Sequence, residues 1–215
     1  RFRMPAEMIR DNALAISGLL STKMGGPPVM PFQPDNIWRT VGRNGPKWNA
    51  AKDEDRFRRG VYVIWRRAAP YPSFVNFDAP DRAACVIERP RSNTPLQALT
   101  LLNDRAFVEM AVALASTVVL HSQGAGELRA QLAYAMQRCV ARVPVSEEID
   151  VLEKLYEAEL SRFSIDPTAV DALLDNNRVV TGDGRAELTL MDRNHLAALS
   201  VVCNVLLNLD ETSNY

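Results

Sequence analysis

Apolar residues recur every three to four positions through most of this chain, and this spacing constrains its fold more than any other feature. In the stretch ELRAQLAYAMQRCVAR, an apolar face is formed by Leu128, Leu132, Ala135, Met136 and Cys139. Comparable stripes begin near Pro5, Pro95, Asp104, Ser146, Pro167 and Asn194. Strand-like alternation is scarce. The sequence therefore predicts an all-α array of about seven or eight helices within a single domain spanning residues 1–215.

One helix start is marked with particular clarity. Thr94 is a candidate N-cap, Pro95 falls at the first helical position, and Gln97 completes a T-x-x-Q capping box. Three leucines, together with Ala98, then give this predicted helix an apolar face: Leu96, Leu99 and Leu102. Asp104 is positioned to cap the next helix, and Ser146 a later one.

A long segment with little regular structure, residues 23–77, interrupts the helical pattern in the first half of the chain; we call it the irregular excursion. Its first part, KMGGPPVMPFQP, is too rich in glycine and proline for regular structure. The sequence of residues 53–67 favours a helix, because acidic residues at its start and arginines at its end suit the helix dipole. The β-branched and aromatic stretch VYVIW makes a short strand over residues 60–65 the alternative. Residues 70–93 read as a proline-started helical turn followed by a loop.

Composition places the chain among ordinary globular proteins, with 47% hydrophobic and 24% charged residues. No apolar run is long enough to span a bilayer, and no signal peptide is recognisable. Because the sequence starts at Arg1 without an initiator methionine, we expect it to be part of a longer protein.

The net charge of −1 conceals two halves of opposite sign. Residues 1–92 carry 16 Lys/Arg and 9 Asp/Glu, whereas residues 93–215 carry 9 and 17. Such a chain can pair its halves internally or present a basic face to a partner. Internal pairing is the interpretation we favour.

The residues that bind metals and haem are sparse. The two histidines, His121 and His195, belong to no H-x-x-x-H or C-x-x-C-H pattern, and the three cysteines are far apart in sequence. We therefore expect no metal site, no cofactor and no disulfide scaffold.

Aromatic and basic residues gather in the irregular excursion. Residues 32–77 hold nine of the fifteen aromatic residues, with nine Lys/Arg and four acids. Trp38, Trp48 and Trp65 form a candidate platform for stacking a sugar or single-stranded nucleic acid. The alternative is that the rings cover the core beneath a long loop. We keep carbohydrate open as a ligand and do not expect nucleic acid.

Charged residues alternate through the following segment. The candidates for a polar network or binding site are Arg66, Arg67, Asp78, Asp81, Arg82, Arg89 and Arg91. Asp78 and Asp81 in FDAPDR are also candidate acid and base residues, although loop aspartates beside proline more often form turns. We expect the network to be internal and to pin the loop against the helix that begins at Thr94.

The stretch RRGVYVIWRRAAPYPSFVNFDAPDRAACVIERPRSNTPLQALTLLND resembles a family of unknown function, the C-terminal domain of large exported planctomycete proteins that also carry a cytochrome-c-like module. AEMIRDNALAISGLL, MGGPPV and LAALSVVCNVLLNLDE match the same pattern. The resemblance implies a planctomycete parent, export to the periplasm or cell surface, and neighbouring modules, one of them haem-bearing. It supplies no catalytic residues.

Two functional hypotheses follow from these observations. The first is a non-catalytic scaffold or interaction domain that serves the haem-bearing and other modules of the parent. The second is an enzyme or binding domain for extracellular polysaccharide, with Asp78 and Asp81 as acids and the tryptophans as a sugar platform.

Overall fold

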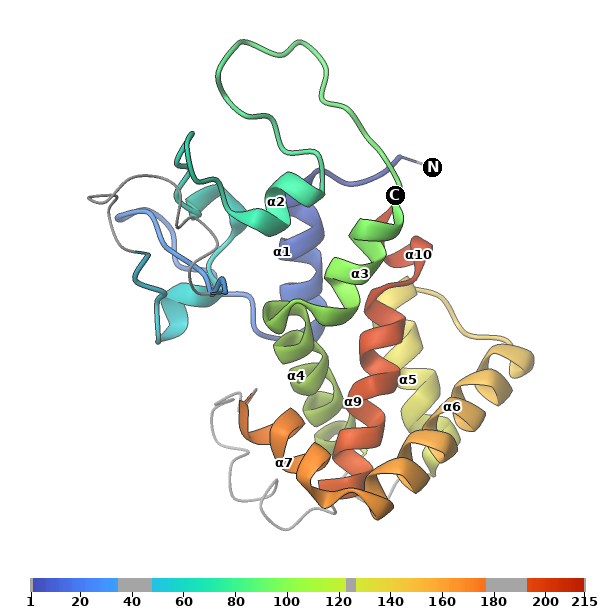
Figure 1. The fold of residues 1–215 in the computed structure, drawn as a ribbon. Coiled ribbons are helices and arrows are strands. Elements are labelled where there is room, and N and C mark those ends of the chain that lie inside the picture. Colours follow the sequence, from blue (N-terminus) through green and yellow to red (C-terminus); the bar gives the residue numbers. More distant parts are fainter. Residues whose placement is uncertain (1, 35–47, 123–126, 177–192, 215) are drawn as a thin grey trace.

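A computed structural model describes residues 2–34, 48–122, 127–176 and 193–214, and within these residues the predicted all-α class is confirmed (Figure 1). Its α-helices are α1 (Ala6–Ser17), α2 (Pro72–Asn76), α3 (Pro95–Asn103), α4 (Arg105–His121), α5 (Leu128–Val140), α6 (Ser146–Ile165), α7 (Pro167–Asn176), α9 (Arg193–Leu207) and α10 (Asp210–Ser213). Two short 3₁₀ helices, η1 (Glu54–Phe57) and η2 (Gly60–Tyr62), lie in the irregular excursion.

The core is built around α4 and α9, which form the most extensive helix pair (Figure 1). Both helices are buried over most of their surface, in keeping with the alanine- and valine-rich sequence of α4 and the leucine- and valine-rich sequence of α9. The helices α1, α5, α6 and α7 pack around them with one apolar stripe each. No described helix has both the length and the apolar character needed to cross a membrane.

The predicted helix starts are largely confirmed. Thr94 accepts a hydrogen bond from the Gln97 N–H, and Asp104 accepts one from the Ala106 N–H at 2.9 Å. At α6, Ser146 is the first helical residue rather than the cap. The preceding Val145 donates its N–H to the Glu148 carboxylate at 2.9 Å, so an acid in the first turn replaces the expected serine.

The face that α3 turns toward the core differs from the predicted one. Leu96 and Leu99 are both 55% exposed, and Leu102 is 36% exposed; we call these three residues the leucine face. The buried side of α3 carries Leu101 together with the polar Gln97 and Thr100. These two polar side chains are fixed by hydrogen bonds to neighbouring segments, which determines the side of the helix that packs inward.

The predicted helix over residues 53–67 is wrong. The segment forms η1 and η2 and then runs extended, with Val29 donating to the Tyr62 carbonyl and Ile64 donating to the Val29 carbonyl. A continuous α-helix is disfavoured by the low helix propensity of Gly60 in the middle of the segment. Gly60 instead lies directly against α1, where an added Cβ would stand 2.9 Å from the Glu7 Cβ. Val61, the residue after Gly60, is 69% exposed.

Candidate functional site

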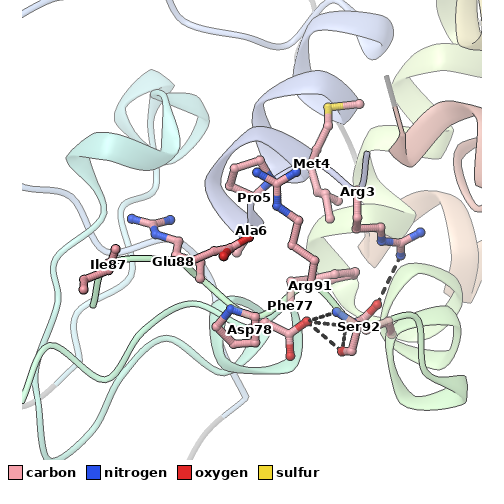
Figure 2. A pocket seen from close by; sticks show the side chains of 14 residues that line it. Arg3, Met4, Pro5, Ala6, Phe77, Asp78, Ile87, Glu88, Arg91 and Ser92 are labelled. Carbon is pink, nitrogen blue, oxygen red and sulfur yellow. Dashed lines mark hydrogen bonds between the residues drawn. The ribbon is translucent and has the colours of Figure 1, made fainter. Parts of the chain in front are cut away.

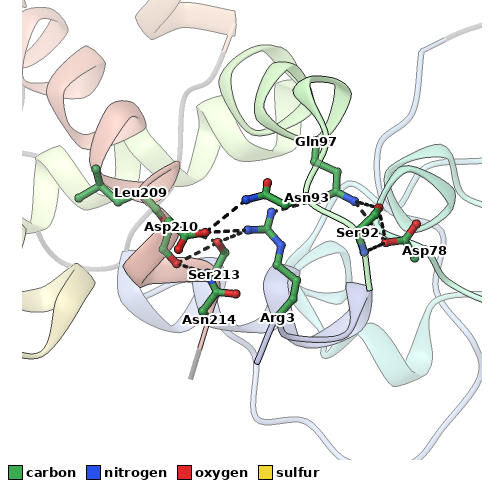
Figure 3. Close-up of polar contacts among 9 residues, drawn as sticks. All are labelled: Arg3, Asp78, Ser92, Asn93, Gln97, Leu209, Asp210, Ser213 and Asn214. Atoms are coloured by element: carbon green, nitrogen blue, oxygen red, sulfur yellow. Dashed lines mark hydrogen bonds and ion pairs between the residues drawn. The ribbon is translucent and has the colours of Figure 1, made fainter. Parts of the chain in front are cut away.

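The loop between α2 and α3 rises away from the helical body at the top of Figure 1, and Asp78 closes its base. Asp78 adopts a positive φ of 60°, which a short polar side chain tolerates. Its Oδ2 accepts hydrogen bonds from the Ser92 N–H at 2.7 Å, the Ser92 hydroxyl at 2.6 Å and the Gln97 amide at 3.4 Å (Figure 3). The carboxylate thus joins the two ends of the loop.

The same network continues to both ends of the chain (Figure 3). The Gln97 side chain, 1% exposed, accepts from Arg3 at 3.3 Å instead of completing the predicted capping box. Arg3 also donates to the Ser213 hydroxyl at 2.6 Å and lies 3.6 Å from Asp210. Gln97 is therefore a junction between the N-terminal segment, the loop and α3, and Arg3 links this junction to α10.

Asp81 has a separate task farther along the loop. Its Oδ1 accepts from the Ala83 N–H at 2.9 Å, and its backbone carbonyl accepts from the Trp65 indole at 3.2 Å. The Arg82 guanidinium lies 4.8 Å from the Trp65 ring centroid. Asp81 is a turn-forming residue in this geometry, as aspartates in loops commonly are.

The arginines of this segment reach other parts of the molecule. Arg89 donates to Glu7 of α1 at 2.9 Å, and the Arg91 guanidinium lies 5.7 Å from the Phe2 ring centroid. Arg66 lies over Trp48 at 5.6 Å, whereas Arg67 is exposed. The contacts of Arg89 and Arg91 pin the loop to α1 and to the N-terminal segment, whereas Asp78 and Ser92 attach it to α3 through Gln97.

A pocket of about 190 Å³ lies between this loop and the start of α1 (Figure 2). Its charged lining comprises Arg3, Asp78, Glu88, Arg89 and Arg91. Asp78 borders the pocket and Asp81 does not, so the pocket does not bring the two proposed acids together. Its volume is below the roughly 300–1,000 Å³ of typical small-molecule sites.

The tryptophans hold irregular backbone in place. The Trp48 indole donates to the Pro31 carbonyl at 2.8 Å, and its ring stacks on Tyr71 with centroids 6.2 Å apart. Trp48 and Trp65 are both partly buried, and Trp38 lies outside the described residues. The contacts of Trp48 and Trp65 favour the interpretation that these rings cover the core.

Two buried arginines that the sequence reading did not single out organise the excursion. Arg58 is fully buried and donates to the carbonyls of Pro27, Lys23 and Gly25, with its guanidinium 3.8 Å from the Tyr62 ring centroid. Arg10 is 4% exposed and donates to the backbone of residues 56 and 58. Arg10 lies within the apolar stripe of α1, and this position in the sequence could have indicated that its side chain is buried.

The histidines and cysteines occupy structural positions. His121 ends α4 and stacks on Tyr134, and His195 lies 2.6 Å from the Tyr156 hydroxyl. Cys85 is exposed, whereas Cys139 and Cys203 are buried and burial raises the pKa of both thiols. Within the described ranges, no group of three or more His, Cys, Asp or Glu side chains is arranged to hold a metal ion.

Most of the chain is similar in sequence to one known protein family. Residues 1–156 match the sequence model of a family described as PSD1, protein of unknown function (DUF1553). Neither a curated protein nor a solved structure matches the chain.

Proposed function

We propose that this chain, which belongs to the PSD1 family of proteins of unknown function, is a non-catalytic interaction domain whose docking surface is the leucine face of α3. The observation that carries the proposal is the exposure of three leucines on one side of a helix whose opposite side is anchored. Leu96, Leu99 and Leu102 lie three positions apart, so they share one side of the helix.

The leucine face is rigidly presented. Thr94 caps the helix, Asn76 of α2 donates to Thr100 at 3.0 Å, and Gln97 is held by Ser92 at 3.0 Å. A docking surface that is ordered before binding loses less entropy when the partner arrives.

The size of the leucine face favours a tethered partner. Because each leucine is only about half exposed, burying it contributes about 1 kcal/mol, or roughly 3 kcal/mol for the three. That is less than the roughly 4 kcal/mol of a millimolar complex between free proteins. A module on the same polypeptide is present at an effective concentration of about millimolar, so a modest apolar surface suffices.

The positions of the chain ends support the same partner. Both ends lie near α3 in Figure 1, and Arg3 contacts Gln97 directly. Polypeptide that continues from either end therefore leaves the molecule close to α3, the helix that carries the leucine face. The setting we propose, on the resemblance described above, is an exported planctomycete protein whose neighbouring modules include a haem-bearing one.

The geometry supports this function over hydrolysis of polysaccharide. Asp78 and Asp81 are occupied by hydrogen bonds within the loop, and they do not face one another across the pocket of Figure 2. A glycosidase requires two carboxyl groups on opposite sides of the scissile bond.

Cysteine labelling tests the proposal. In a Cys85→Ser background, Leu99→Cys should react with a maleimide rapidly in this chain alone and many-fold more slowly in the intact parent protein. The matched control is Val151→Cys on α6, 65% exposed, which should react at similar rates in both proteins. Equal labelling of position 99 in the two proteins would contradict the proposal.

A further inference from the structure

A second pocket, of about 230 Å³, lies between α1, the first turn of α4 and the irregular excursion. Its lining is strongly basic, with the charged residues Arg10, Lys52, Arg56, Arg105 and Glu109. Four cations thus surround the space with one carboxylate. Such an excess of one charge in a concave site attracts ions of the opposite sign.

Arg10 is the most deeply buried of these cations. Its two terminal nitrogens donate to the carbonyls of Arg58 at 2.7 Å and Arg56 at 2.5 Å. The neighbouring carboxylate, Asp11, is 4.0 Å away, accepts from the Gly60 N–H at 2.6 Å and lies 3.5 Å from Arg59. A buried charge compensated mainly by carbonyl dipoles is costly unless an anion accompanies it.

One buried donor in this lining is unused. The Nε atom of Arg56 is buried and has no hydrogen-bond partner among the described residues, whereas the Arg10 side chain also hydrogen-bonds with the buried Tyr71 hydroxyl. One terminal nitrogen of Arg56 pairs with the Glu109 carboxylate at 2.5 Å, and the Nε remains without an acceptor. Buried N–H groups are rarely left unpaired, so the Arg56 donor points to a missing acceptor.

Aromatic rings form part of the walls. Phe32 lies 4.6 Å from the Arg105 guanidinium, and Phe57 lies 4.4 Å from that of Arg56. A guanidinium stacked on a ring is held in a fixed plane, and its fork of N–H groups matches the geometry of an oxyanion.

We propose that this pocket binds a small oxyanion, a carboxylate, sulfate or phosphate group, through Arg56, with the buried charge of Arg10 behind it and with Lys52 and Arg105 at its rim. The volume suits a group of this size rather than a drug-sized molecule. The site is separate from the leucine face and does not depend on the interaction function.

Titration calorimetry with the intact chain tests the proposal. The probes are sodium sulfate, phosphate and acetate, each compared with sodium chloride at equal ionic strength, so that general screening cancels. We expect saturable one-to-one binding of at least one probe, and the pattern among the three identifies the preferred oxyanion.

Variants locate the site. Lys52→Gln and Arg105→Gln are exposed changes and should each weaken binding at least three-fold, whereas Glu109→Gln should strengthen it by removing the competing carboxylate. The control is Arg129→Gln on α5, which removes a cation paired with Asp150 and Glu153 elsewhere on the surface. The proposal is overturned if no probe binds saturably, or if Arg129→Gln changes the affinity as much as Lys52→Gln and Arg105→Gln.

Discussion

Asp78 shows how one side chain in this molecule can order a long loop. A loop without regular structure has a large conformational entropy to lose and needs partners for its backbone. The Asp78 carboxylate provides three hydrogen bonds at the base of the loop, and the buried Arg58 provides three more to residues 23–27. In both cases a single charged group satisfies several donors or acceptors at once.

At the residue scale, we predict that Asp78→Ala lowers the free energy of unfolding by about 2 kcal/mol, because the N–H and hydroxyl of Ser92 lose their acceptor and the buried Gln97 amide loses one of its two acceptors. Chemical denaturation with urea measures this change. Arg67→Ala is the matched control on an exposed residue of the same segment and should stay within about 0.5 kcal/mol of wild type. If the Asp78 variant is as stable as wild type, Asp78 does not hold the loop in place, and the loop is again a candidate functional surface.

Among the elements, the irregular excursion is held against α1 by close backbone contact. Gly60 is buried in η2, and a Cβ at this position would stand 2.9 Å from the Glu7 side chain and 3.0 Å from its backbone. Because the added Cβ would meet backbone atoms of Glu7, which cannot move aside as a flexible side chain can, the contact has little room to relax. Glycine is required here by proximity rather than by its backbone angles.

We therefore predict that Gly60→Ala destabilises the protein by about 1–3 kcal/mol, because η2 must move away from α1. Thermal unfolding followed by circular dichroism gives the shift in midpoint. Val61→Ala, at the exposed neighbouring position, serves as the comparison and should have little effect. A Gly60 variant that melts with the wild type would show that the excursion adjusts freely.

Comparison of these elements shows what the sequence could predict. The starts of α3 and α4 were predictable because Thr94 and Asp104 act on N–H groups two or three residues away. The structure of residues 53–67 was not, because it depends on contacts with residues far away in sequence, such as that of Gly60 with Glu7. Periodicity likewise located the leucine face but not its exposure, since the partners of Gln97 come from other segments. The contacts of the site depend on the same kind of distant pairing.

At the scale of the whole molecule, the turn between α5 and α6 is joined to the C-terminal segment by one arginine. Arg142 pairs with Glu148 at 2.6 Å and with Glu211 at 3.0 Å. The hydrogen bond from Arg142, together with the Val145 N–H, lowers the pKa of Glu148 to about 2. A carboxylate with a depressed pKa contributes stability that is present above its ordinary pKa and is lost as the pH falls.

We predict that the stability difference between wild type and Glu148→Gln is full at pH 6 and declines as the pH falls from about 4.5 toward 2. Urea midpoints of the two proteins across this range measure it. Glu147→Gln, at the exposed preceding residue, controls for the general effect of removing one negative charge. A difference that does not change with pH would contradict the assigned role of the Arg142–Glu148 pair.

The meeting of the two ends has a topological consequence. Met4 donates to the Ser213 carbonyl at 3.1 Å, and Asn12 donates to the Thr212 carbonyl at 2.8 Å, so a linker of a few residues would close the backbone into a ring. The exposed stretch 81–91 is then a natural place to cut it, since surface loops tolerate new ends. The helices of such a circularly permuted chain would follow one another in a different order and still make the same contacts. This fold depends on the packing between helix surfaces rather than on the order of the helices along the chain.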